Sequence, residues 1–275
     1  MEQIKTIKLY QVDAFTDKLF GGNPAAVCRL DKWLNNELLQ NIAAENFLPE
    51  TAFFVSRADS PDNHFDIKWF TPEIEMDLCG HATLATAHVI FNHFQLNTNK
   101  IIFNSNSGQL IVEKQNDLII LDFPSRMPVE VELPEIILNG IGIKPIETLK
   151  SRDYVLLYDN EDTVRNITPN QQILNEINLG TGGIIVTAKA NKENNGIDFV
   201  SRFFTPQSSI LEDPVTGSAH CSLIPYWSKR LNKTEMIALQ VSKRVGKLYC
   251  ENFGDRVLIS GKCKTYLEGQ INIYE

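Results

Sequence analysis

Lys-Trp-Phe-Thr-Pro at residues 68–72, followed by Cys-Gly-His-Ala at residues 79–82, is a pattern that this chain contains twice. The second copy reads Arg-Phe-Phe-Thr-Pro at residues 202–206 and Thr-Gly-Ser-Ala at residues 216–219. The repeat predicts a duplicated unit in which each half has one turn from a loop into a helix. Because the first turn of a helix has free N–H groups, two such turns suit the binding of an anionic substrate.

The bulk composition is typical of a soluble globular protein. The chain has 275 residues, 43% hydrophobic and 22% charged, enough for one large domain or two of ordinary size. Its net charge is −8 and it has no long run of Lys and Arg, so nucleic acid is not an expected partner. No apolar run approaches the roughly 18 residues of a membrane span, and residues 1–5 lack the apolar region of a signal peptide. We therefore predict a cytoplasmic protein without a membrane partner.

The pattern of apolar residues predicts many short strands and two nearly uncharged helices. Those helices are expected at residues 81–91 and 218–229, each directly after one copy of the repeated glycine. A helix with little charge on any face is buried on all sides. This combination favours mixed sheets wrapped around a central helix in each half over a doubly wound parallel sheet. The proline-rich stretch at residues 124–145 is a candidate linker.

The two glycine turns are candidate binding elements. Gly80 and His81 open the first expected helix, and Gly217 and Ser218 open the second. A glycine at such a position lets a ligand come close to the backbone, where free N–H groups bind anions. The alternative is structural: the glycines serve only helix–sheet packing, and Ser218 is the N-cap of its helix. The match between the two copies keeps the binding interpretation open beside the structural one.

Two acidic residues are candidates for proton transfer. Glu50 precedes the apolar strand expected at residues 51–55, and a carboxylate against such a strand would be partly removed from water, which suits a general acid or base. Asp213 lies just before the second glycine turn. The simpler interpretations are that Glu50 is a solvated loop residue and that Asp213 is an Asx-turn residue before Pro214.

The five cysteines do not predict a disulfide framework or a metal site. Their number is odd, their spacing is wide and no Cys-x-x-Cys occurs. Most are therefore expected to be buried apolar thiols. Cys79 is kept as a candidate functional residue because it lies inside the repeated pattern.

Several segments together resemble the PhzF family, the phenazine biosynthesis PhzF-like isomerases, whose fold is that of diaminopimelate epimerase. The segments occur in the family's order and span most of the chain. They are Asp-Ala-Phe at 13–15, Gly-Asn-Pro-Ala-Ala-Val at 22–27, Pro-Glu-Thr-Ala-Phe at 49–53, Phe-Thr-Pro at 70–72, Cys-Gly-His-Ala-Thr at 79–83 and Glu-Asp-Pro-Val-Thr-Gly-Ser-Ala at 212–219.

The resemblance implies an α+β fold of two pseudo-symmetric halves, each a mixed, curled β-sheet around a central helix. The N-terminal half would comprise residues 1–123, completed by a last strand at about 264–275, and the C-terminal half would comprise residues 124–263. The resemblance also implies a homodimer that works without a metal or an organic cofactor, on a small-molecule carboxylate.

The activity implied by the resemblance is that of an isomerase that moves a proton between carbons of a small unsaturated carboxylate or amino acid. The family's general acid/base glutamate falls on Glu50. Its other site residues fall on His81, Asp213 and Ser218 as catalytic residues and on Gly80 and Gly217 as substrate-binding residues. The N–H groups at both glycine turns would hold the developing negative charge, as in an oxyanion hole.

Two alternatives stay open. Cys79 occupies the place of the first catalytic cysteine of the related racemases and epimerases, whereas Thr216 stands about where the second would be. A two-cysteine racemase is therefore not predicted, but an epimerase or dehydratase that uses a Cys79 thiolate is an alternative to an inert Cys79. The second alternative is a catalytically silent binding protein of the same fold, which the retained set of catalytic residues disfavours.

Overall fold

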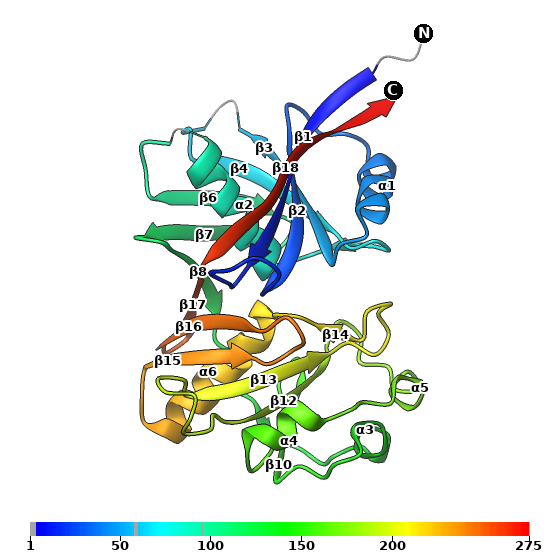
Figure 1. Cartoon of the computed structure of the whole chain (residues 1–275), viewed down its shortest axis with the longest axis vertical. Helices are drawn as coiled ribbons and strands as arrows, with labels where there is room; N and C mark the ends of the chain where they lie inside the picture. The colour runs from blue at the N-terminus through cyan, green and yellow to red at the C-terminus, as the bar shows by residue number, and fades with distance from the viewer. Residues whose placement is uncertain (1–3, 58–59, 95, 275) are drawn as a thin grey trace. The chain divides into compact units, whose positions relative to one another are not determined.

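The chain divides into two units, and each contains one copy of the repeated pattern (Figure 1). Unit 1 comprises Met1–Asp122 and Ser260–Glu275, and unit 2 comprises Phe123–Ile259. The computed structural model describes residues 4–57, 60–94 and 96–274.

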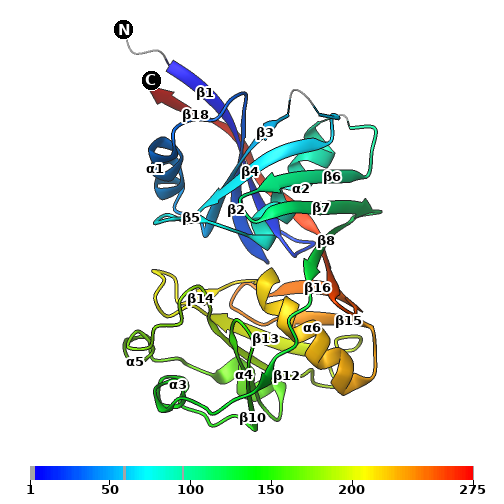
Figure 2. The same ribbon diagram turned by 180° about the vertical axis from the view of Figure 1, so that it is seen from behind.

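Unit 1 is a mixed sheet curled around one central helix (Figures 1 and 2). Its elements are β1 (Ile4–Ala14), β2 (Asn23–Leu30), α1 (Asn36–Asn46), β3 (Glu50–Ser56), β4 (His64–Phe70), β5 (Glu75–Met76), α2 (Gly80–His93), β6 (Lys100–Ser105), β7 (Gly108–Gln115), β8 (Leu118–Pro124) and β18 (Cys263–Tyr274). The strands pair in the order β18-β1-β2-β3-β4-β6-β7-β8. The pairs β2–β3 and β4–β6 are parallel, and the other pairs in this order are antiparallel.

Unit 2 is also a mixed sheet with a central helix. Its elements are β9 (Val129–Glu130), α3 (Glu135–Ile141), β10 (Glu147–Lys150), β11 (Tyr154–Leu157), α4 (Glu161–Asn166), α5 (Gln171–Leu174), β12 (Ile184–Lys189), β13 (Phe199–Phe204), β14 (Glu212–Asp213), α6 (Gly217–Leu231), β15 (Glu235–Gln240), β16 (Gly246–Phe253) and β17 (Arg256–Gly261). The pairing order β9-β10-β11-β12-β13-β15-β16 has two parallel pairs, β11–β12 and β13–β15.

The two units share one strand topology. In unit 1 the series β2-β3-β4-β6 is paired parallel, antiparallel and parallel, and in unit 2 the series β11-β12-β13-β15 is paired in the same way. The fold class expected from the sequence is therefore confirmed: each half is a mixed sheet around a helix, and neither is a doubly wound parallel sheet.

The repeated Phe-Thr-Pro marks the same place in both units. Phe70 ends β4 and pairs with Thr51 of β3, while Phe204 ends β13 and pairs with Ile184 of β12. A two-residue strand, β5 or β14, then pairs back onto β4 or β13 and leads to the start of α2 or α6. Thr51 and Ile184 therefore occupy the same position in the two units. The residues before them, Glu50 and Gly183, are counterparts as well.

Both central helices are buried because apolar side chains cover most of their surface. α2 packs against β1, β2 and β3, and its Leu84, Val89 and Ile90 are inaccessible to solvent. α6 packs against β15 and β16, and Trp227 stacks on Phe199 of β13 with ring centroids 5.6 Å apart. In the described part of the chain, no helix has the length and apolar character to cross a membrane.

The linker expected at residues 124–145 is wrong. This stretch contains β9 and α3, and Ile137 and Ile141 of α3 lie in the hydrophobic core of unit 2. Pro134 is the N-cap of α3, so this proline begins a helix. Proline is well tolerated at helix starts because the first N–H groups have no partner within the helix.

Gly22 supplies a test of how tightly the start of β2 is built. Gly22 and Gly180 both have φ of +60°, but a Cβ at Gly22 would overlap the Ala14 carbonyl oxygen, whereas a Cβ at Gly180 would have no neighbour within 4 Å in the described structure. We expect Gly180→Ala to lower the free energy of unfolding by about 1–2 kcal/mol, the cost of the left-handed conformation. Gly22→Ala should lower it by roughly a further 1–3 kcal/mol because of the overlap. Urea denaturation measures both values, and equal losses would contradict the predicted close packing.

Candidate functional site

The first candidate centre is a buried ion pair in unit 1. Glu50 is the first residue of β3 and His81 is the second residue of α2. Glu50 Oε2 lies 3.0 Å from His81 Nε2, and the two side chains are 15% and 4% exposed. The chain brings them together because β4 pairs with β3 and then returns through β5 to the start of α2. The structure therefore joins two of the residues predicted for catalysis.

The other ring nitrogen of His81 also has partners. Asn23 Nδ2 lies 3.1 Å from Nδ1, and Cys79 Sγ lies 3.6 Å from it. Asn23 begins β2, which runs parallel to β3 with Ala25 opposite Glu50, so the starts of both strands lie at one edge of the sheet. Asn23 lies in the segment at residues 22–27 that carries the family resemblance, but the sequence alone assigned it no role in the site. The sequence feature that could have marked Asn23 is a polar residue at the start of an apolar strand. In the structure its side chain is fully buried.

The surroundings of His81 favour its protonated form. Burial alone would lower the pKa of His81, but the neighbouring Cys79 sulfur and Glu50 carboxylate outweigh it and raise that pKa well above its ordinary value. Asn23 can pair with either protonation state of the His81 ring. Its amide donates from Nδ2 when His81 Nδ1 is unprotonated. When Nδ1 carries a proton, the amide rotated by half a turn accepts at Oδ1. The ring can thus gain or lose a proton without losing this partner.

Cys79 is a buried thiol. Burial raises its pKa, the Glu50 carboxylate raises it further, and the opposing effect of His81 does not reverse the direction. The other four cysteines are also free and buried. The raised pKa favours the thiol form of Cys79, so Glu50 is the standing negative charge beside His81, and a Cys79 thiolate would raise the pKa of His81 further.

The same three side chains are the one group in the described residues with enough donors to hold a metal ion. The donor atoms of Glu50, Cys79 and His81 lie within 4.8 Å of one another. The carboxylate and Nε2 already face each other, and the thiol keeps its proton, so a metal ion would have to break the pair and deprotonate the sulfur. The arrangement suits proton transfer better than metal binding.

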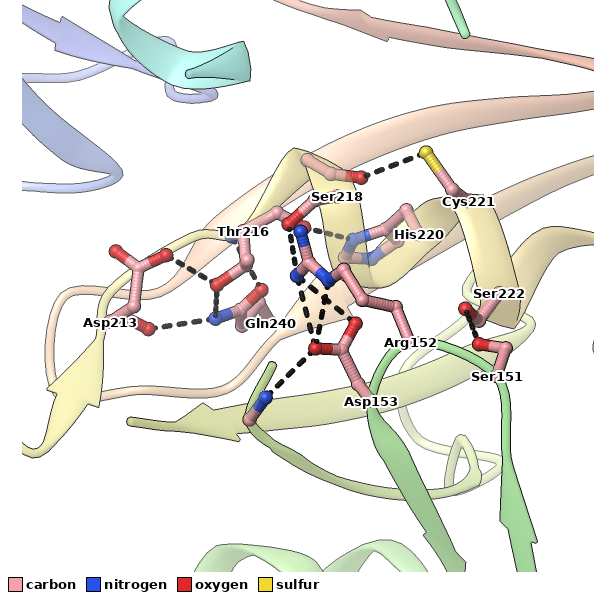
Figure 3. A network of polar contacts seen from close by, with 12 residues as sticks. Ser151, Arg152, Asp153, Asp213, Thr216, Ser218, His220, Cys221, Ser222 and Gln240 are labelled. Carbon is pink, nitrogen blue, oxygen red and sulfur yellow. Dashed lines mark hydrogen bonds and ion pairs between the residues drawn. The ribbon is translucent and has the colours of Figure 1, made fainter. Parts of the chain in front are cut away.

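The second candidate centre lies at the start of α6 in unit 2 (Figure 3). Thr216 is the N-cap of this helix, so the interpretation of Ser218 as the N-cap is wrong. The Thr216 hydroxyl donates to Asp213 Oδ2 over 2.5 Å. Gln240 closes the turn, because its Nε2 donates to the Asp213 carbonyl and its Oε1 accepts from the Thr216 N–H, each over 2.8 Å. Asp213 is thus held in place at the turn before Gly217.

Ser218 is joined to two residues that the sequence analysis missed. Arg152 Nη2 donates to Ser218 Oγ over 2.9 Å, and the same guanidinium contacts the Asp153 carboxylate (Figure 3). Burial raises the pKa of Asp153, although Arg152 and the Gly183 N–H lower it. Arg152 and Asp153 carry no motif in the sequence, since they only precede the short strand β11.

The starts of both central helices leave backbone donors for other groups. In the described structure neither N-cap side chain, Cys79 or Thr216, accepts a hydrogen bond from the first helical turn. The N–H groups near Gly80 and Gly217 are therefore not capped from within their own turns. This is consistent with the anion binding predicted for both glycines, which stays a prediction.

Comparison with known proteins gives the family. A family model described as phenazine biosynthesis-like protein matches residues 12–269. An uncharacterized isomerase of Pseudomonas aeruginosa is 45% identical over 267 residues, which are 97% of this chain and 99% of that protein. The crystal structure of a PhzF-family phenazine biosynthesis protein from Enterococcus faecalis has a TM-score of 0.91 at 45% identity and covers 98% of this chain and 100% of that chain.

A more distant structure shows the fold alone. A hydroxyproline epimerase from Agrobacterium vitis has a TM-score of 0.62 at 10% identity and covers 100% of this chain and 95% of that chain. The chain belongs to the phenazine biosynthesis-like family of PhzF proteins, as the family match and the close relatives show.

The raised pKa of His81 predicts a pH-dependent stability. A histidine whose pKa is higher in the folded than in the unfolded chain stabilises the fold fully below the unfolded value of about 6.5, and this contribution is lost as the pH rises through the folded value. Glu50→Gln removes the charge that holds the proton. We therefore expect the free energy of unfolding to differ more between wild type and Glu50→Gln at pH 6 than at pH 9, in urea denaturation.

The matched control is Glu75→Gln. Glu75 is also in unit 1, and its partner 3.8 Å away is Lys68 and not a histidine. Its effect on stability should be the same at both pH values. A Glu50→Gln effect that is equally independent of pH would show that His81 does not carry the proton.

Proposed function

We propose that this family member is an isomerase that moves a proton between two carbons of a small unsaturated carboxylate or amino acid, with Glu50 as the general acid/base and without a metal or organic cofactor. The observation that carries the proposal is the buried Glu50–His81 pair at 3.0 Å. Isomerase chemistry at the level of the family is supported by the relatives, three of which are named uncharacterized isomerases.

Glu50 has the features that a one-base mechanism requires. Its Oε2 faces His81, so Oε1 is the oxygen that we assign to the substrate. In the first step the carboxylate removes a proton from a carbon next to the conjugated carboxylate, and the electron pair moves into the unsaturated system. In the second step the resulting carboxylic acid returns the proton to another carbon on the same face. One side chain therefore acts as base and then as acid.

His81 has two assigned tasks in this scheme. As an imidazolium it forms an ion pair with the Glu50 carboxylate across 3.0 Å, and this pair holds the carboxylate in place. It also lies directly after Gly80, whose backbone N–H we assign to the negative charge that develops on the substrate. In unit 2, Gly217 is assigned to substrate binding, and Asp213 and Ser218 are assigned to orienting polar groups of the substrate or relaying its protons.

The two alternatives receive less support. A dehydratase or epimerase that uses Cys79 needs a thiolate, but Cys79 is only 6% exposed and burial raises its pKa. A silent binding protein would have no use for a carboxylate and an imidazole that are buried against each other, because burying an ion pair costs desolvation energy. The assignment as a homodimer remains a prediction.

Deuterium exchange tests the proposed reaction. A panel of small unsaturated carboxylates and amino acids, including dihydro-hydroxyanthranilate, is incubated with the protein in D₂O and followed by proton NMR. Wild type should place deuterium on carbon in at least one compound, with or without prior dialysis against EDTA. Glu50→Gln should lose about 10²–10⁴-fold in rate, the usual contribution of a general acid/base. Glu75→Gln, the control that removes another carboxylate of unit 1, should keep the rate.

The exchange experiment has two contrary outcomes. Near wild-type exchange by Glu50→Gln would remove Glu50 from the mechanism, and a loss of exchange after EDTA treatment would contradict the metal-independent reaction.

Cys79→Ser separates the main proposal from the thiol alternative. Because Cys79 is a protonated thiol in contact with His81, its replacement by a hydroxyl of similar size should leave the rate of exchange close to that of wild type. The same NMR assay measures it on the compound that wild type converts. A loss as deep as that of Glu50→Gln would favour a dehydratase or epimerase that uses Cys79.

A further inference from the structure

The two units place different side chains at the same position. His81 follows the glycine that opens α2, and Ser218 follows the glycine that opens α6. In unit 1, His81 is held by Glu50 and Asn23, which begin the parallel strands β3 and β2. In unit 2 the corresponding strands are β12 and β11, and the residues just before them are Gly183 and the pair Arg152 and Asp153. Unit 2 thus holds its Ser218 from the same strand ends, but with a cation.

The contact between Arg152 and Ser218 has only one possible direction. Arg152 Nη2 lies 2.9 Å from Ser218 Oγ, and a guanidinium donates hydrogen bonds but accepts none (Figure 3). The Ser218 oxygen is therefore the acceptor, which leaves its own O–H to donate to a different group. A serine held in this way presents its proton to an incoming acceptor.

We propose that Arg152 is a positioning residue that makes the Ser218 hydroxyl a hydrogen-bond donor to the carboxylate of the substrate. The inference rests on the proposed function, which assigns Ser218 to the substrate, and adds the residue that sets its direction and the chemical group that it recognises. Arg152 acts through Ser218 in this account.

A buried carboxylate anchors Arg152. Arg152 Nε and Nη2 donate to Asp153 Oδ1 over 3.1 and 3.0 Å, and the Asp153 side chain is fully buried. The Gly183 N–H donates to the same oxygen over 2.9 Å. A Cβ at Gly183 would come within 2.7 Å of the Phe204 carbonyl oxygen, so only glycine fits where this N–H approaches Asp153. The guanidinium is therefore fixed on the side of Ser218 by a rigid part of the sheet.

The charges around Ser218 favour an anion. Arg126 is close enough to Asp153 to lower the pKa of that carboxyl, and its buried Nη1 has no hydrogen-bond partner among the described residues. Two guanidiniums thus lie near one carboxyl group, and Arg152 is the one that is bonded to it. Whether Asp153 is ionised or protonated, these three side chains carry at least one positive charge in excess. A serine donor beside such a charge matches a carboxylate better than a neutral amide or hydroxyl.

The first arm of the test needs no ligand. Ser218→Cys places a thiol where the hydroxyl was, and its pKa follows from the rate of alkylation by iodoacetamide against pH. The five native cysteines are buried, whereas position 218 is partly exposed. Donation from Arg152 should stabilise the thiolate and lower the thiol pKa about one unit or more below the ordinary value of about 8.5. Adding Arg152→Gln should return it toward that value.

Arg230→Gln is the matched control for this arm. Arg230 also belongs to unit 2 but contacts Glu147 and Tyr226, so its loss should leave the thiol pKa unchanged. An equal pKa with and without Arg152 would overturn the proposal. An equal rise from Arg152→Gln and from Arg230→Gln would overturn it too, because it would show a general effect of charge.

The second arm identifies the ligand group with two matched probes, anthranilate and anthranilamide, which differ only in the carboxylate. Calorimetry should show that wild type prefers anthranilate and that Arg152→Gln weakens its binding about tenfold or more. In a Ser218→Ala background, Arg152→Gln should cause little further loss, because the two residues act as one unit. Arg152→Lys should not restore binding, since a lysine lacks the planar fork that reaches Asp153 and Ser218 together.

Each contrary result of the second arm has a definite meaning. Equal binding of the two probes, or binding of neither, would overturn the carboxylate assignment. Equal losses from Arg152→Gln in the wild-type and Ser218→Ala backgrounds would overturn the claim that Arg152 acts through Ser218. Neither arm depends on turnover, so a failure of the proposed isomerase reaction in D₂O would be seen separately.

Discussion

The ion pair between Glu50 and His81 is the interaction on which the rest of this account depends. A carboxylate and an imidazole are costly to bury, and the fold compensates by placing them 3.0 Å apart with Asn23 on the far side of the ring. That placement requires β2 and β3 to run parallel, β4 to return along β3, and α2 to begin directly after the short strand β5. The mixed sheet is therefore the device that brings three residues distant in sequence to one point.

The same arrangement of strands and helix occurs in both units, but it holds different side chains in each. Both units bring the ends of two parallel strands to the start of a buried helix, but unit 1 places a carboxylate and an imidazole there, whereas unit 2 places a guanidinium and a hydroxyl there. His81 can gain and lose a proton, whereas Arg152 stays charged at all ordinary pH values. The proton transfer that we propose would use both properties, because the negative charge that forms on the substrate must be held while the proton moves.

The sequence predicted the parts of the fold that local patterns control. The two uncharged helices expected at residues 81–91 and 218–229 are α2 and α6, each longer by a few residues, and the mixed-sheet class is confirmed. The linker was wrong because a proline-rich stretch does not always form a loop: Pro134 in this stretch is the N-cap of α3. Glu50 and His81 were candidates from local pattern, and the resemblance gave them catalytic roles, but Asn23 and Arg152 were missed. Their partners lie 58 and 66 residues away in the chain, and only strand pairing reveals such contacts.

The protonation state of His81 in the resting protein tests the central claim most directly. Nitrogen-15 NMR of the imidazole ring distinguishes a ring protonated at both nitrogens from a neutral ring with one N–H. We predict that His81 of the wild type is doubly protonated at pH 7 and that Glu50→Gln converts it to the neutral form, because the negative charge of the Glu50 carboxylate stabilises the imidazolium. A neutral His81 in the wild type at pH 7, or a ring that does not change when Glu50 is replaced, would contradict it.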